Sequence, residues 1–150
     1  MYVYFAVEDL MSSNFLKDLA EESKECISDI NNKIKNTGTA VYSSLMGPRS
    51  NFGTPVLTGH LKSNWIVTTD TEYSDVVGSP ESVDESVRDA HWDEFVNTMN
   101  LYLKHNIFFS NNVYYGPYVN DGRPSKGIIA QRFKEAAIQM GDEYLKANKQ

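Results

Sequence analysis

Cysteine, histidine and long hydrophobic runs are scarce in this sequence, and each scarcity removes a class of protein. The single cysteine, Cys26, can form neither an internal disulfide nor a cysteine-rich metal site, so folding does not depend on an oxidising compartment. No apolar run approaches the roughly 20 residues that cross a bilayer. The apolar start at residues 1–7 lacks the positive charge of a signal peptide. We therefore expect no membrane segment and synthesis in the cytoplasm.

Basic residues are also few, since 14 lysines and arginines face 20 acidic residues and give a formal net charge of −6. Phosphate backbones and anionic membranes attract proteins through clustered positive charge. Binding to nucleic acid through a basic face is therefore not expected, and neither is adhesion to a membrane surface.

The motifs of common catalytic sites are missing. The histidines are His60, His91 and His105, and no two lie three or four residues apart, so no helical pair of metal ligands exists and exposed polar positions are expected for them. Serine-hydrolase elbows and phosphate-binding glycine loops are absent as well. Cys26 lies on the apolar stripe of the predicted first helix and is interpreted as a small buried hydrophobe. We expect no catalytic residue, no metal and no cofactor.

The length of 150 residues, with 41% hydrophobic and 12% aromatic side chains, suits one domain with a substantial core, residues 1–150. Residues 2–7 predict a short strand. A long helix is then expected from Ser12 or Ser13 to the Gly47-Pro48 pair, interrupted at Gly38. Its apolar stripe consists of Phe15, Leu19, Cys26, Ile27, Ile30, Ile34, Val41 and Leu45.

Further along the chain, residues 47–60 read as a loop and Leu61 to Thr69 as a strand anchored by Trp65. A helix is predicted over 82–104, two strands over 107–110 and 113–120, a turn at Asp121-Gly122 and a closing helix over 128–147. In that last helix the apolar positions include Ile128, Ile129, Phe133, Ala137 and Leu145. The predicted fold class is α+β, with the long N-terminal helix and the C-terminal helix packed on a small antiparallel sheet.

The tyrosine-rich strand predicted over 113–120 indicates an assembly surface. Tyrosine buries a large flat area at low conformational cost and is favoured where proteins meet. Alternation in a strand places Tyr114 and Tyr118 on one side and Tyr115 on the other, and Pro117 suits an edge strand. The expected interface residues are Trp65, Tyr114, Tyr115, Pro117, Tyr118, Arg123 and Lys126.

Charge of opposite sign is concentrated in two separate segments. Between Thr71 and Glu94 there are eight acidic residues and one basic residue, Arg88, whereas four basic residues follow the Asp-Gly turn, namely Arg123, Lys126, Arg132 and Lys134. If the basic segment contacts the acidic segment of an adjacent identical subunit, the pairing is head-to-tail, and such contacts close into rings.

Three segments together resemble the tail-completion and neck proteins of tailed bacteriophages. They are Gly53-Thr54-Pro55-Val56-Leu57-Thr58-Gly59-His60-Leu61-Lys62-Ser63-Asn64-Trp65, then the stretch from Ile107 to Gly122 that contains Asn111-Asn112-Val113-Tyr114-Tyr115-Gly116-Pro117-Tyr118, and then Pro124-Ser125-Lys126-Gly127-Ile128. The likeness covers roughly residues 12–147. The chain departs from the family pattern at Leu57, His60 and Asn120, and its segment over 71–104 is longer.

This resemblance implies a structural virion protein that forms a ring of six copies at the head-tail junction. It would contact the head connector or adaptor and the tail tube, and the genome DNA would pass through the ring without specific binding. Localisation in the neck or tail of the virion, after synthesis in the host cytoplasm, follows from this. Two alternatives remain open from the residues themselves: a small metal-dependent hydrolase that uses carboxylates, and an inhibitor module that binds one host protein.

Overall fold

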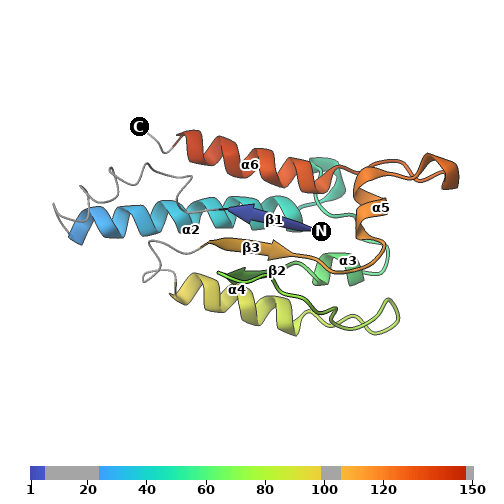
Figure 1. The fold of residues 1–150 in the computed structure, drawn as a ribbon, viewed down its shortest axis with the longest axis horizontal. Coiled ribbons are helices and arrows are strands. Elements are labelled where there is room, and N and C mark those ends of the chain that lie inside the picture. The colour runs from blue at the N-terminus through green and yellow to red at the C-terminus, as the bar shows by residue number, and fades with distance from the viewer. Residues whose placement is uncertain (6–23, 99–105, 148–150) are drawn as a thin grey trace.

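The computed structural model describes residues 1–5, 24–98 and 106–147, and Figure 1 shows their arrangement. Its strands are β1 (Tyr2–Phe5), β2 (Ile66–Thr69) and β3 (Ile107–Ser110). Its helices are α2 (Lys24–Met46), α3 (His60–Ser63), α4 (Ser86–Thr98), α5 (Gly116–Asp121) and α6 (Phe133–Ala147), with short 3-10 turns at Arg49–Asn51 and Pro124–Lys126. This arrangement confirms the predicted α+β class with two long helices on a small antiparallel sheet.

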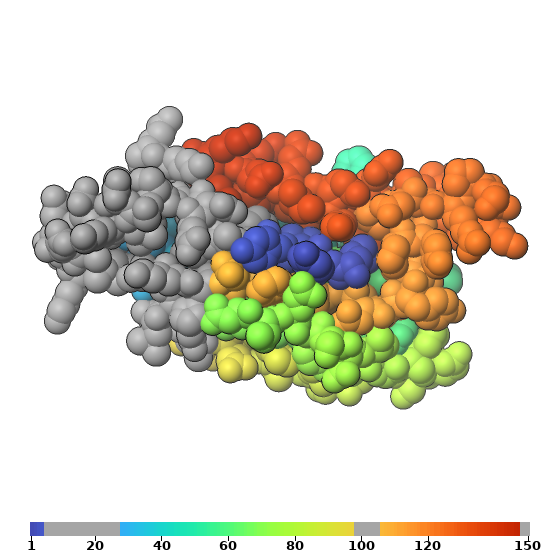
Figure 2. All heavy atoms as spheres, in the orientation of Figure 1, coloured from blue at the N-terminus to red at the C-terminus, as the bar shows by residue number. Residues whose placement is uncertain are grey.

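The sheet has the strand order β1-β3-β2, so β3 pairs with both neighbours. Successive side chains of a strand point to opposite faces. The row formed by Val3, Phe109 and Val67 is buried, whereas the neighbouring row formed by Tyr4, Phe108 and Thr68 is half-buried or exposed. One face of the sheet therefore belongs to the core. Figure 2 shows β1 at the molecular surface on the other side.

The two long helices supply most of the remaining core. α2 buries a stripe that includes Ile34, Val41 and Leu45, and α6 buries Phe133 and Ala137 against it. The spacing of three, four and seven residues gives each helix one apolar face. The stripe predicted from Ile30 onward is confirmed, and the helix ends at Met46, next to the Gly47-Pro48 pair as expected.

Gly38 does not interrupt α2, which is a correction to the predicted break. A Cβ atom at this position would lie 2.7 Å from the ring of Phe95 on α4. The glycine therefore lets two helices approach closely. The lower helix propensity of glycine, about 1 kcal/mol relative to alanine, is offset within a helix of 23 residues.

Three elements, β2, α4 and α6, begin later in the chain than predicted. β2 begins at Ile66 and not at Leu61, because residues 60–63 form α3. α4 begins at Ser86, where Asp84 Oδ1 accepts hydrogen bonds from the Ser86 N–H at 2.9 Å and hydroxyl at 2.6 Å. These bonds lower the pKa of Asp84. Side chains of Asp and Ser readily form hydrogen bonds with nearby backbone groups at the start of a helix.

The closing helix α6 begins at Phe133 and not at residue 128. Arg132 has a positive φ of 56°, which a helix cannot contain, and the Lys134 N–H donates to the Oδ1 of the buried Asn120 at 2.8 Å. Ile128 and Ile129 are consequently outside the helix and exposed. The expectations that concern residues 6–23 and 99–104, and that for His105, lie outside the described residues.

Candidate functional site

The tyrosine-rich segment does not form a strand, which corrects the prediction for residues 113–120. Residues 114–115 form a turn and Gly116–Asp121 form α5, with Pro117 in its first turn. β3 ends at Ser110 because Asn111 takes over the local hydrogen bonding: its Oδ1 accepts the Val113 N–H at 3.2 Å and its Nδ2 donates to the Leu61 carbonyl at 2.8 Å. Proline in the first turn of a helix loses no hydrogen bond.

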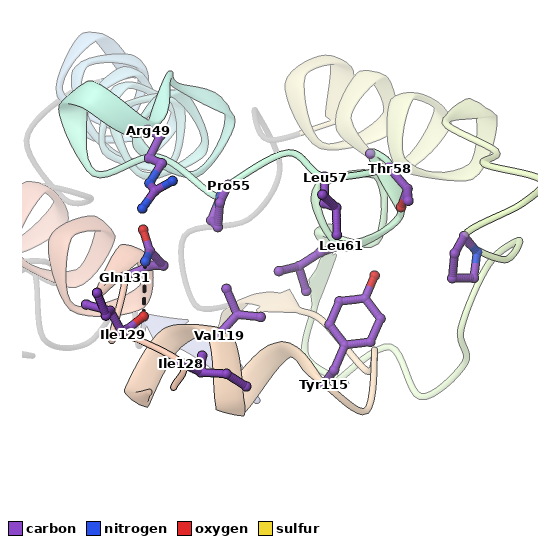
Figure 3. Close-up of a pocket in the computed structure, with 12 residues that line it drawn as sticks. Arg49, Pro55, Leu57, Thr58, Leu61, Tyr115, Val119, Ile128, Ile129 and Gln131 are labelled. Atoms are coloured by element: carbon purple, nitrogen blue, oxygen red, sulfur yellow. Dashed lines mark hydrogen bonds between the residues drawn. The ribbon is translucent and has the colours of Figure 1, made fainter. Parts of the chain in front are cut away.

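An apolar groove of about 430 Å³ lies between α5, α3 and the loops that flank them (Figure 3). Its lining residues are mostly apolar and come from four segments of the chain. They are Arg49, Pro55, Leu57, Thr58, Gly59, Leu61, Pro80, Tyr115, Val119, Ile128, Ile129 and Gln131. The set contains one charged side chain, Arg49, and neither a carboxylate nor an imidazole. A groove of this composition is suited to binding an apolar group and offers no acid-base pair.

One end of the groove is fixed by a turn that requires glycine. Gly59 has a φ of 88°, and the Thr58 Oγ1 accepts the His60 N–H at 3.3 Å, which starts α3. The Tyr115 hydroxyl points toward Thr58 (Figure 3). Burial raises the pKa of Tyr115, and the Thr58 side chain offsets the shift only in part. Tyr115 is thus held in the groove wall as a neutral side chain.

The histidines differ from their expected exposure. His60 is buried, and its Nδ1 lies 3.4 Å from Asn64 Nδ2. His91 is half-buried, and its ring lies 5.4 Å from that of Tyr73. Both therefore have structural contacts with neighbouring side chains.

Two charged projections extend from the end of the molecule where α5 lies (Figure 1), and each contributes a lining residue to the groove. The first, the basic tongue, comprises residues 123–128 and is closed by an antiparallel bridge between Arg123 and Ile128. The Arg123 guanidinium lies 5.0 Å from the Tyr118 ring centre, and Lys126 is exposed in the 3-10 turn. Cation-π contact of this kind fixes the direction of the tongue relative to α5.

The second projection, the acidic loop, comprises residues 70–85 and contains no basic side chain. Its six carboxylates are exposed: Asp70, Glu72, Asp75, Glu81, Asp84 and Glu85. Side-chain amides anchor this loop to the fold. Asn64 binds both backbone groups of Val77, accepting its N–H at 2.7 Å and donating to its carbonyl at 3.0 Å, and Asn112 donates to the Tyr73 carbonyl. These hydrogen bonds hold the acidic loop in place through Tyr73 and Val77.

Replacing Asn64 by alanine is expected to lower the free energy of unfolding by about 2 kcal/mol, because it removes the partner of both Val77 backbone groups. Hydrogen exchange of the Val77 amide should accelerate, and urea denaturation should report the stability loss. Asn36→Ala, at an exposed position of α2, is the matched control and should leave both unchanged. Unaltered exchange at Val77 in Asn64→Ala would contradict the anchoring role.

The predicted interface residues divide into three groups by exposure. Tyr114 and Tyr118 are 83% and 44% exposed, and Arg123 and Lys126 are exposed in the basic tongue. Tyr115 and Pro117 are half-buried. Trp65, by contrast, is 0% exposed and lies in the core, so its place in the predicted interface is corrected. Its anchoring role is confirmed, with the ring edge-on to Phe133 and Nε1 donating to Thr54 Oγ1 at 2.9 Å.

Sequence reasoning missed the residues that complete the groove, above all Arg49, Leu57, Val119 and Gln131. Two lining residues gave a usable signal, Leu57 from this group and also Ile129. Leu57 is an apolar residue in a predicted loop, and Ile129 follows Pro124 and Gly127 too closely to begin a regular helix. Arg49 and Gln131 gave none, because their proximity depends on how α2 and α6 are packed.

In the part of the chain that the structure describes, no three His, Cys, Asp or Glu side chains are grouped so as to hold a metal ion. Nor does this part contain a helix whose length and apolarity would let it traverse a bilayer. Comparisons with protein-family models, curated protein sequences and solved structures gave no match.

Proposed function

We propose that this protein is a structural subunit without catalytic activity that assembles into a ring of six copies at the head-tail junction of a tailed bacteriophage. The proposal starts from the resemblance of residues 53–65, 107–122 and 124–128 to tail-completion and neck proteins. Its physical support comes from one observation: the basic tongue and the acidic loop project from the same end of the molecule (Figure 1), and aromatic and apolar side chains around the groove are exposed.

Several large apolar and aromatic side chains at this end of the molecule are unusually exposed to solvent. Leu57 is 98%, Ile129 78% and Tyr114 83% exposed. Isolated exposed hydrophobic residues are ordinary, but several beside one groove indicate an interaction surface. Burial of such side chains against a partner, whether a neighbouring copy or another component of the virion, would supply favourable free energy of association.

Opposite charge gives the association a direction. Glu72, Asp75 and Glu81 in the acidic loop have no ion-pair partner among the described residues, and the same holds for Arg123 and Lys126 in the basic tongue. Contact between the basic tongue of one copy and the acidic loop of the next would give both groups of charged side chains ion-pair partners. Because the two surfaces differ, this contact is heterologous and closes into a ring when the rotation permits.

The net charge of −6 per copy agrees with a DNA conduit. Around a ring it does not favour tight binding of phosphates, which suits passage of the genome through the centre. The connector or adaptor and the tail tube are the proposed neighbours along the ring axis.

Charge reversal tests the head-to-tail contact. Arg123→Glu with Lys126→Glu, or Asp75→Lys with Glu81→Lys, is expected to abolish rings in light scattering and negative-stain images of the protein mixed with its connector. The two pairs combined should restore them, since the charges are exchanged across the contact. Light scattering should show at least tenfold weaker association for each single pair, a difference of about 1.4 kcal/mol.

Asp142→Lys with Lys146→Glu is the control, because both residues are exposed on α6 far from the groove, and this variant should form rings normally. A wild-type protein that stays monomeric with the connector would contradict the proposed function. A one-to-one complex with a host protein would favour the inhibitor module instead.

A further inference from the structure

The apolar groove carries a second inference about what this chain binds. We infer that it is a docking site for an extended apolar segment of a different protein, held by its main chain and by a carboxylate that pairs with Arg49. The inference deepens the proposed function and rests on it in one respect: the ring contact is assigned to the two charged projections, which leaves the groove between them open to another partner.

The shape of the groove favours an extended chain. Figure 3 shows Arg49 and Gln131 facing each other at one end and Thr58 with Tyr115 at the other, with Leu61 and Val119 between them. The volume of about 430 Å³ falls within the roughly 300–1,000 Å³ of small-ligand sites and accommodates two or three apolar side chains of a peptide.

The two rims of the groove offer free main-chain groups. The backbone N–H of Leu57 on one rim and that of Ile129 on the other have no hydrogen-bond partner among the residues that the structure describes. The Ile129 carbonyl accepts a bond from its neighbour Gln131 at 3.0 Å, which fixes this rim. An extended peptide can satisfy unpaired main-chain groups while its side chains enter the apolar floor.

Charge selects the partner. Arg49 is the one charged side chain among the lining residues, and it has no ion-pair partner in the described part of the chain. A guanidinium presents its donors in a fork that matches a carboxylate. The fitting occupant is therefore a segment with apolar residues next to an acidic side chain or a free carboxyl terminus.

A second copy of this chain fits the groove less well than another protein does. The longest segment of a copy that carries carboxylates and no basic side chain is its acidic loop, whose Pro80 already lines the wall of its own groove. The same loop is assigned to the tongue of the neighbouring copy. Segments of the connector or the tail tube, which approach along the ring axis, face no such competition.

Four tetrapeptides test the inference, with the ¹⁵N-labelled full-length protein as receptor. They are acetyl-Val-Leu-Val-Asp-amide and acetyl-Asp-Val-Leu-Val-amide, each with an Asn counterpart that differs only in the carboxylate. At least one Asp peptide should bind about fivefold more tightly than its Asn counterpart, as expected for one partly exposed ion pair. The shifted amide signals should be those of Leu57, Val119 and Ile129.

Arg49→Gln should remove the preference for the Asp peptide while leaving weaker binding of both. Lys146→Gln, which removes an exposed cation far from the groove, should preserve the preference. Ile129→Asp should abolish binding of all four peptides. Light scattering of Arg49→Gln with the connector should still show rings, because the ring contact uses other residues.

Three results would overturn the inference: equal affinity for the Asp and Asn peptides, binding of none at millimolar concentration, or a preference that persists in Arg49→Gln. Dissociation of assembled rings by the Asp peptide would assign the groove to a neighbouring copy and would also overturn it. Peptide binding by a protein that never forms rings would contradict the proposed function and leave the groove assignment standing.

Discussion

Trp65→Ala is expected to lower the free energy of unfolding by about 3–5 kcal/mol, as found for large aromatic residues removed from well-packed cores. The side chain is completely buried, and its ring is edge-on to Phe133 at 6.1 Å. Its Nε1 donates to the hydroxyl of Thr54, which is also buried, so the substitution leaves both a cavity and an unpaired hydroxyl. Urea denaturation followed by circular dichroism measures the loss.

Trp92→Ala is the matched control for this prediction. Trp92 is half-buried on α4 and stacks on Tyr42 with ring centres 4.0 Å apart, so a smaller loss of about 1–2 kcal/mol is expected. If Trp65→Ala left the stability within about 1 kcal/mol of the wild type but prevented ring formation, then Trp65 would belong to an interface and the core assignment would be wrong.

Gly53→Ala should lower the free energy of unfolding by about 3 kcal/mol, because a Cβ atom there would lie 1.9 Å from the Gly47 carbonyl oxygen. The clash involves two backbone segments and no flexible side chain that could move away. Gly53 N–H donates to the Pro48 carbonyl at 3.0 Å, which closes the turn after α2. Since Pro55, two residues further along the chain, lines the groove, peptide binding there should weaken as well.

Gly127→Ala separates this clash from the general loss of backbone freedom. Gly127 has a φ of 70° and no atom within 4 Å of the added Cβ, so only the left-handed conformation opposes alanine, at about 1–2 kcal/mol. Differential scanning calorimetry of the two variants should show the larger decrease in melting temperature for Gly53→Ala. Equal decreases would mean that the turn after α2 relaxes and does not hold the groove in shape.

Both predictions concern residues from the segments that resemble tail-completion proteins, and they divide these segments into two roles. Thr54, Asn111 and Asn120 are buried and satisfy backbone or side-chain groups of neighbouring segments. They determine where the loops run. Leu57 and Tyr114 are exposed and free to contact another chain. A motif of this kind therefore combines scaffold residues with contact residues.

Regular elements with strong periodicity were predictable from the sequence. The apolar stripe of α2 from Ile30 to Leu45 is buried as expected, and the strand at Tyr2–Phe5 is confirmed within its described residues. Such patterns report burial directly, because one face of a helix or strand must be apolar wherever it packs on a core.

The tyrosine-rich segment shows where pattern reasoning failed. Tyrosine and valine favour strands, and residues 113–120 fit the alternation of a strand as well as they fit a helix. The deciding interactions are distant in sequence: Asn111 binds Leu61, fifty residues earlier, and the Val119 carbonyl accepts the Gln131 N–H. Tertiary hydrogen bonds thus override a local preference of about 1 kcal/mol.

The sequence by itself determined the class of the fold, the negative charge and the separation of acidic from basic segments, since these depend on composition and on short-range periodicity. Only the tertiary structure decided that Trp65 is internal, that Ile128 and Ile129 are exposed, and that Arg49 lies at the end of an apolar groove. The groove brings together four segments between residues 49 and 131. No local sequence pattern predicts that these segments lie together, because their proximity results from the packing of α2, α5 and α6 around one core.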